Sequence, residues 1–93
     1  MRQVKVTQQA DALYGLIQRR NRLDVARLGE IRRAFLETVA QLGRSEEWIW
    51  LIKSDRYPDA ALMYQPPLKI HFRLVNDDAI GIVDIEEIRL LDS

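Results

Sequence analysis

The chain has 93 residues, 47% hydrophobic and 30% charged, and its 14 basic residues balance its 14 acidic ones. This composition is typical of a globular protein rather than a disordered one, and the length predicts one domain spanning 1–93. No membrane-length apolar run, secretory signal pattern or cysteine occurs, so we expect a cytoplasmic protein without disulfides, thiolate zinc sites or cysteine nucleophiles.

The charges are unevenly distributed along the chain. Residues 1–44 carry nine basic and four acidic residues, whereas residues 45–93 carry five basic and ten acidic ones. Such a division can create a basic face for nucleic acid or an acidic partner. It can equally reflect two halves that neutralise each other across their interface.

The first half predicts a strand and two helices. Residues 3–7, QVKVT, alternate polar and β-branched side chains, as a half-buried strand does. From Gln8 onward, apolar residues recur at helical spacing for about three turns. A second helix begins after Asp24, a suitable N-cap, and ends at Gly43. Its apolar stripe consists of Val25, Leu28, Ile31, Phe35, Val39 and Leu42.

The second half predicts the rest of a sheet. Residues 46–53, EEWIWLIK, are apolar on both faces and favour a buried strand, with a short third helix capped by Ser45 as the alternative. Residues 54–59 form a loop because Pro58 does not suit a central strand. Residues 60–64 are a further strand candidate. Residues 68–75 and 79–85 flank an Asn-Asp-Asp turn and predict a β-hairpin.

The first hairpin strand places Lys69, His71 and Arg73 on one face, opposite a row of apolar residues. These three are our candidate catalytic residues. A histidine can act as acid or base, and Lys or Arg can stabilise a phosphorane, so the row could cleave RNA through its 2′-hydroxyl. The alternative is that these residues form the ordinary polar face of a hairpin, and spacing alone favours this alternative.

Two stretches resemble the RelE/ParE superfamily of bacterial toxins. VKVTQQADAL near the start is similar to the strand and Ala-containing helix that open these proteins. PLKIHFRLVNDDAIGIVDI is similar to their pattern YRIVFRxxDDxVxILDI. The resemblance implies an α+β fold with an N-terminal strand, a two-helix hairpin and an antiparallel sheet of three to four strands. It also implies that an antitoxin protein is the partner.

The resemblance carries over to the candidate site only in part. In the ribonuclease branch an Arg heads the hairpin strand, and Lys69 stands there, which keeps the charge but loses the bidentate guanidinium. A second basic residue sits on the preceding strand, for which the nearest here are Lys53 and Arg56. The C-terminal Tyr or His of the branch has no counterpart, because the chain reads EEIRLLDS after Ile85.

Three functions follow as hypotheses. We favour a toxin-like component of a type II toxin–antitoxin pair that acts by binding a protein such as DNA gyrase, or that has diverged from an active toxin. The first alternative is a ribosome-dependent, metal-independent mRNA endonuclease that uses Lys69, His71 and Arg73. The second is a non-toxic interaction or scaffold module. A homo-oligomer is compatible with each, and we expect no membrane association and no cofactor.

Other features have plain structural interpretations. Trp48 and Trp50 could stack on bases, but core packing is the better account of both. Glu86 and Glu87 would point to opposite faces of a strand and so make a poor acid–base pair. With one histidine and no cysteine, a metal site would have to be rich in carboxylates, and no spacing indicates one.

Overall fold

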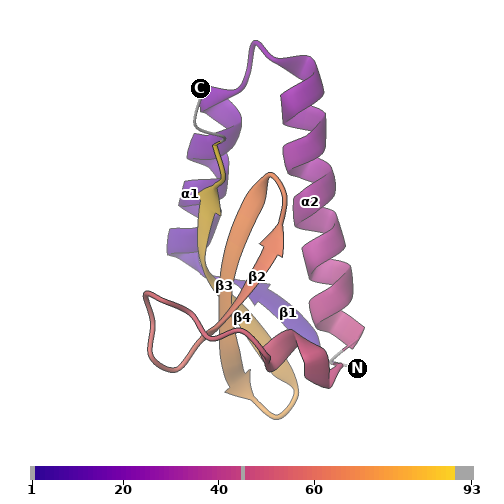
Figure 1. The fold of residues 1–93 in the computed structure, drawn as a ribbon, viewed down its shortest axis with the longest axis vertical. Coiled ribbons are helices and arrows are strands. Elements are labelled where there is room, and N and C mark those ends of the chain that lie inside the picture. Colours follow the sequence, from indigo (N-terminus) through magenta and orange to yellow (C-terminus); the bar gives the residue numbers. More distant parts are fainter. Residues whose placement is uncertain (1, 45, 90–93) are drawn as a thin grey trace.

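The structure is a computed structural model that describes residues 2–44 and 46–89. Its elements are β1 (Gln3–Val6), α1 (Gln8–Arg20), α2 (Val25–Arg44), a 3₁₀ helix η1 (Glu47–Trp50), β2 (Ala61–Gln65), β3 (Leu68–Asn76) and β4 (Ala79–Glu87). The strands form one sheet in the order β1-β4-β3-β2, with β1 parallel to β4 and the other pairs antiparallel. Figure 1 shows α1 and α2 standing side by side, joined by a short turn at the top of the view.

Both helices begin at side-chain caps. The Thr7 hydroxyl accepts a hydrogen bond from the Ala10 amide at 3.2 Å, which caps α1. Asp24 caps α2 as predicted, since its carboxylate accepts from the Arg27 amide at 3.0 Å. Each bond satisfies an amide that has no partner within its own helix, and the Asp24 cap sets where the short turn between the helices ends.

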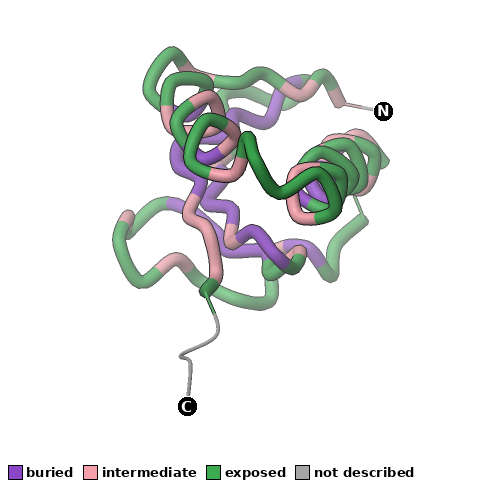
Figure 2. The backbone as a smooth tube through the Cα atoms, turned by 90° about the horizontal axis from the view of Figure 1, so that it is seen from above, coloured by how far each residue is buried: buried purple, intermediate pink, exposed green. Residues whose placement is uncertain are grey.

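The core lies between the helices and one face of the sheet. Ile31 and Leu42 of the predicted stripe on α2 are fully buried, and so are Ile70 and Phe72 on β3. Figure 2 shows this buried backbone in purple, enclosed by exposed helical turns in green. Val25, the first member of the predicted stripe, is instead 81% exposed because it is the first residue of α2 and lies next to the turn between the helices.

The expected strand over 46–53 is wrong. Residues 47–50 form η1, in which Trp48 is half exposed, Ile49 is buried and Trp50 packs on Phe72 with ring centroids 5.1 Å apart. The short helix reverses the chain after α2, and within 46–53 only Lys53 makes a sheet-like bridge, to Ala61. A run that is apolar on all sides cannot by itself distinguish a strand from a short helix. Ser45, the cap of the alternative, lies outside the described residues.

The hairpin has the predicted position and is slightly longer. β2 and β3 are joined by a tight turn that contains a cis Pro66–Pro67 peptide bond. β3 and β4 pair closely, with irregularities after His71 and Leu74.

The helices contact β4, β3 and β2 on one face, while the loop 51–60 lies alongside the hairpin (Figure 1). No helix within the described ranges is long and apolar enough to cross a membrane.

Candidate functional site

The loop 51–60 closes over the strand face that carries the three candidate residues. Lys69, His71 and Arg73 alternate along β3 on the face opposite the buried residues Ile70 and Phe72. The prediction of an exposed polar row is wrong for the histidine, because His71 is 0% exposed. The Lys69 and Arg73 side chains keep 18% and 40% of their surface.

His71 is held on both ring nitrogens. Its Nδ1 lies 2.7 Å from the Ser54 hydroxyl and its Nε2 lies 2.6 Å from a Glu86 carboxylate oxygen. The Ser54 oxygen also accepts from the amides of Arg56 and Tyr57, at 3.1 and 3.0 Å. Because two amides donate to the Ser54 oxygen, its hydroxyl proton is directed at Nδ1, and the Nε2–H of the ring is directed at Glu86.

Ser54, His71 and Glu86 thus have the order of a nucleophile, base and orienting acid, but they do not have the reactivity of such a triad. Both lone pairs of the Ser54 oxygen accept backbone hydrogens, so none is directed at an electrophile. His71 is fully buried, and no substrate atom can reach it without opening the loop. The three residues therefore hold the loop 51–60 against β3 and β4, and we call them the His71 clasp.

Arg56 and Tyr57 complete the clasp on the neighbouring strand. Asp84 is 1% exposed and accepts from the Arg56 guanidinium at 2.6 Å and from the Tyr57 hydroxyl at 3.1 Å. The other Arg56 terminal nitrogen lies 3.3 Å from Glu86. The hydrogen bond to Asp84 and the charges of both carboxylates raise the pKa of Arg56. One arginine thereby bridges two carboxylates that β4 places against His71.

The remaining candidate cations are paired with loop acids. Lys69 contacts Asp55 at 3.0 Å and Glu86 at 3.8 Å, and Arg73 contacts Asp59 at 2.9 Å. The hydrogen bond from Lys69 lowers the pKa of Asp55, and the same bond raises the pKa of Lys69.

The whole face carries no positive surplus. Its ion pairs join three basic residues, Lys69, Arg56 and Arg73, with four acidic residues, Asp55, Asp59, Asp84 and Glu86. Three paired cations among four carboxylates leave no positive surplus in this set of ion pairs. Binding and cleaving RNA at this face would require a surplus of positive charge, since the scissile phosphate is an anion.

The fold also gathers metal-binding side chains that sequence spacing did not indicate. His71, Asp84 and Glu86 each offer a ligand atom, and these atoms lie within 4.8 Å of one another. His71 and Asp84 are opposite each other across the β3–β4 pair, which only the strand register reveals. Arg56 already bonds both carboxylates, so the negative charge that would attract a metal ion is compensated by protein.

The comparisons with known proteins bear on the fold. No family model matches the sequence, and no curated protein matches it significantly. A chain of the solved structure "Chromosomal ParDE TA system from P. aeruginosa" superimposes with a TM-score of 0.72 at 19% sequence identity. The alignment covers 96% of this chain and 98% of that chain. The fold is ParE-like. The predicted α+β architecture is thereby confirmed, in agreement with the RelE/ParE resemblance.

A second surface, which we call the η1 groove, lies between η1, the residues after it and β2. Its volume is about 390 Å³, and four side chains that line it are largely exposed: Trp48 (47%), Leu51 (80%), Ile52 (49%) and Tyr64 (54%). The sequence assigned this segment to the core, which holds for Trp50 but not for Trp48. The sequence did contain one indication of this exposed surface: all five residues of 48–52 are apolar, more than one short helix can bury.

The η1 groove adjoins an open part of the sheet edge. The Leu62 amide points away from β3 and donates to the Ile52 carbonyl at 2.9 Å. Tyr64 lies two residues further along and directs its backbone groups the same way. Within the described ranges, no backbone group bonds Tyr64 on that side. The η1 groove therefore combines apolar side chains with an unpaired strand edge.

Proposed function

We propose that this chain is the toxin-like component of a bacterial type II toxin–antitoxin pair and that it acts by binding a protein target. The ParE-like fold over nearly the whole chain supports the first part. The observation that carries the second part is the state of the candidate residues: His71 is buried and clasped, while Lys69 and Arg73 are paired with acids. Binding to a partner needs none of these three side chains.

The η1 groove is the surface that best fits the antitoxin. An extended antitoxin segment can add a strand at Tyr64 on the β2 edge and insert alternate apolar side chains between Trp48 and Leu51. Strand addition would satisfy the outward backbone groups and cover an edge that otherwise invites uncontrolled pairing. A second copy of this chain is the competing occupant, and a homo-oligomer seen by light scattering would favour it.

Bacterial growth after induction of this chain tests the mode of action. The parent is compared with a Lys69→Gln, Arg73→Gln variant, which removes the two surface cations while leaving the buried His71 clasp intact. We expect growth arrest with both proteins and intact mRNA on translating ribosomes, as for a toxin with a protein target such as DNA gyrase.

Two other outcomes would favour the alternatives. Arrest by the parent alone, with mRNA cut in the ribosome, would identify an endoribonuclease that uses Lys69, His71 and Arg73. No arrest with either protein, despite folded and soluble chains, would favour the scaffold module. A Trp48→Ser, Leu51→Ser variant adds a separate check, because it should retain arrest but escape neutralisation by an antitoxin co-expressed with it.

A further inference from the structure

The turn between α1 and α2 forms one wall of a second, strongly basic cleft, which we call the arginine cleft. Its volume is about 860 Å³, and it is lined by five arginines, namely Arg19, Arg20, Arg22, Arg27 and Arg89. The acids that line it are Asp24 and Glu87. Five cations against two carboxylates leave a surplus of three positive charges in a chain whose net charge is zero.

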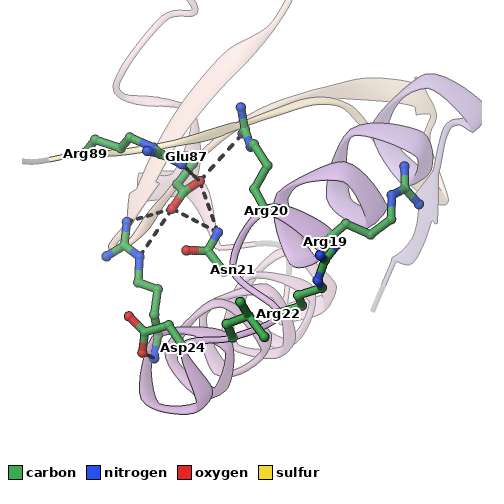
Figure 3. Close-up of a pocket in the computed structure, with 9 residues that line it drawn as sticks. Arg19, Arg20, Asn21, Arg22, Asp24, Glu87 and Arg89 are labelled. Carbon is green, nitrogen blue, oxygen red and sulfur yellow. Dashed lines mark hydrogen bonds and ion pairs between the residues drawn. The ribbon is translucent and has the colours of Figure 1, made fainter.

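Glu87 organises the arginine cleft. Its side chain is only 3% exposed, and its oxygens accept from Arg27 at 3.1 Å and Asn21 at 3.2 Å. Arg20 and Arg89 lie 3.6 and 3.4 Å from the same carboxylate. Figure 3 shows Arg20, Asn21 and Arg89 directed toward Glu87 from different sides, while Arg19 points away along its helix. A single carboxylate thus gathers three guanidinium groups that would otherwise repel one another.

The three arginines around Glu87 have more N–H donors than this one carboxylate can accept. Burial alone would raise the pKa of Glu87, but hydrogen bonds from Arg27 and Asn21 and the charge of Arg89 outweigh it and lower that pKa. One anion can compensate only one of the three cations. Arg20 and Arg89 retain 47% and 64% of their side-chain surface, so their unused N–H groups can meet a second, external anion.

The surroundings of the arginine cleft indicate the class of that anion. Leu23 lines the cleft and is 89% exposed, and the neighbouring Val25 is 81% exposed. Two isolated apolar side chains beside arginines suit a protein segment better than a phosphate backbone, because arginine with apolar contacts is typical of protein interfaces. The acidic second half of the chain also opposes general attraction to nucleic acid.

We propose that the arginine cleft binds an acidic protein segment that contains apolar residues. Its carboxylates pair with Arg20, Arg22 and Arg89, and its apolar side chains cover Leu23 and Val25. This inference does not depend on the toxin–antitoxin proposal, since it concerns another surface. Arg27 and Gln41, which line the arginine cleft and the η1 groove, are 14 residues apart on α2, roughly 21 Å along its axis. Figure 1 shows the helix turn and η1 toward opposite ends of the molecule.

The test uses the full chain and a fluorescein-labelled peptide of alternating Glu and Leu pairs, with binding followed by fluorescence anisotropy. Two variants are compared with the parent. Arg20→Gln with Arg22→Gln removes two charges from the arginine cleft, whereas Lys5→Gln with Arg33→Gln removes two charges from β1 and the outer face of α2. Circular dichroism establishes that each variant is folded.

We expect the parent to bind the Glu-containing peptide, with affinity that falls as salt rises, and not to bind a matched peptide with Gln for Glu. The cleft variant should raise Kd about tenfold, and the control variant should change it less than about twofold. Equal effects of the two variants would overturn the proposal, and so would absence of peptide binding. Tighter binding of a labelled single-stranded oligonucleotide, lost in the cleft variant, would replace the acidic protein with nucleic acid.

Discussion

Replacing Glu87 by Gln tests how much this carboxylate contributes to the stability of the folded chain. Hydrogen bonds to charged groups contribute about 1.5–3 kcal/mol each, and removing one partner of a buried ion pair costs about 3–5 kcal/mol. Gln retains an acceptor for Arg27 but leaves the three gathered arginines without a counter-charge. We therefore expect the free energy of unfolding to fall by about 2–4 kcal/mol, a large share of the about 5–15 kcal/mol of a small domain.

Urea unfolding at pH 7, followed by the fluorescence of Trp48 and Trp50, measures this loss. With an m value of about 1–2 kcal/mol per M, the midpoint of the variant should lie about 1–4 M below that of the parent. Glu37→Gln on the exposed face of α2 is the matched control, and it should change stability by less than about 0.5 kcal/mol. If Glu87→Gln matched this control, Glu87 would not organise the arginine cleft.

The contribution of Glu87 to the free energy of unfolding should decrease as the pH falls. Because the pKa of Glu87 is lower in the folded chain than its ordinary value of 4.5, its contribution is fully present above pH 4.5. The contribution disappears as the pH falls through the depressed folded value, where the carboxylate becomes protonated. The difference in stability between parent and variant should therefore be constant near neutrality and shrink in acid. A difference that grew in acid would contradict the assigned pKa direction.

Three further predictions concern the core and the loop. Phe72→Ala should lower the free energy of unfolding by about 3–5 kcal/mol in urea titrations, because this fully buried ring packs on Trp50. Ser54→Ala should cost about 1–3 kcal/mol and increase proteolytic cleavage in the loop 51–60, because buried His71 loses its partner on Nδ1. Asp55→Asn should leave the urea midpoint unchanged, because Asp55 is exposed, but NMR titration should find the pKa of Lys69 lower than in the parent.

The elements that sequence predicted well are those set by local periodicity. The apolar stripe from Leu28 to Leu42 specifies α2, and the Asp24 cap sets where this helix begins. The two alternating runs around the Asn-Asp-Asp turn specify the hairpin. Glu86 and Glu87 point to opposite faces as the strand period requires, one to His71 and the other to the helix turn.

The features that sequence missed depend on contacts between distant segments. Nothing in residues 51–60 indicates that Ser54 caps a histidine 17 positions later or that Arg56 reaches Asp84. Alternation places His71 opposite the core face but does not say whether that second face is open or covered. The run 46–53 has the same difficulty, since its burial is decided by how η1 packs against β2, and Trp50 against Phe72 of β3, rather than by its own pattern.

The cover over β3 changes what this fold can do. Cations on an open strand would attract phosphate, whereas the same cations paired with Asp55, Asp59 and Glu86 fix a loop in place. A fold does not determine chemistry, and a strand position that supports catalysis in one protein can support only structure in another. The exposed features that remain, the η1 groove and the arginine cleft, lie toward the two ends of α2 and differ in character, one apolar and one basic. The two surfaces share no lining residue and lie roughly 21 Å apart along α2, beyond the Debye length of about 8–10 Å. We therefore expect that partners of different chemistry can occupy the two surfaces together and that binding of one leaves the affinity for the other unchanged.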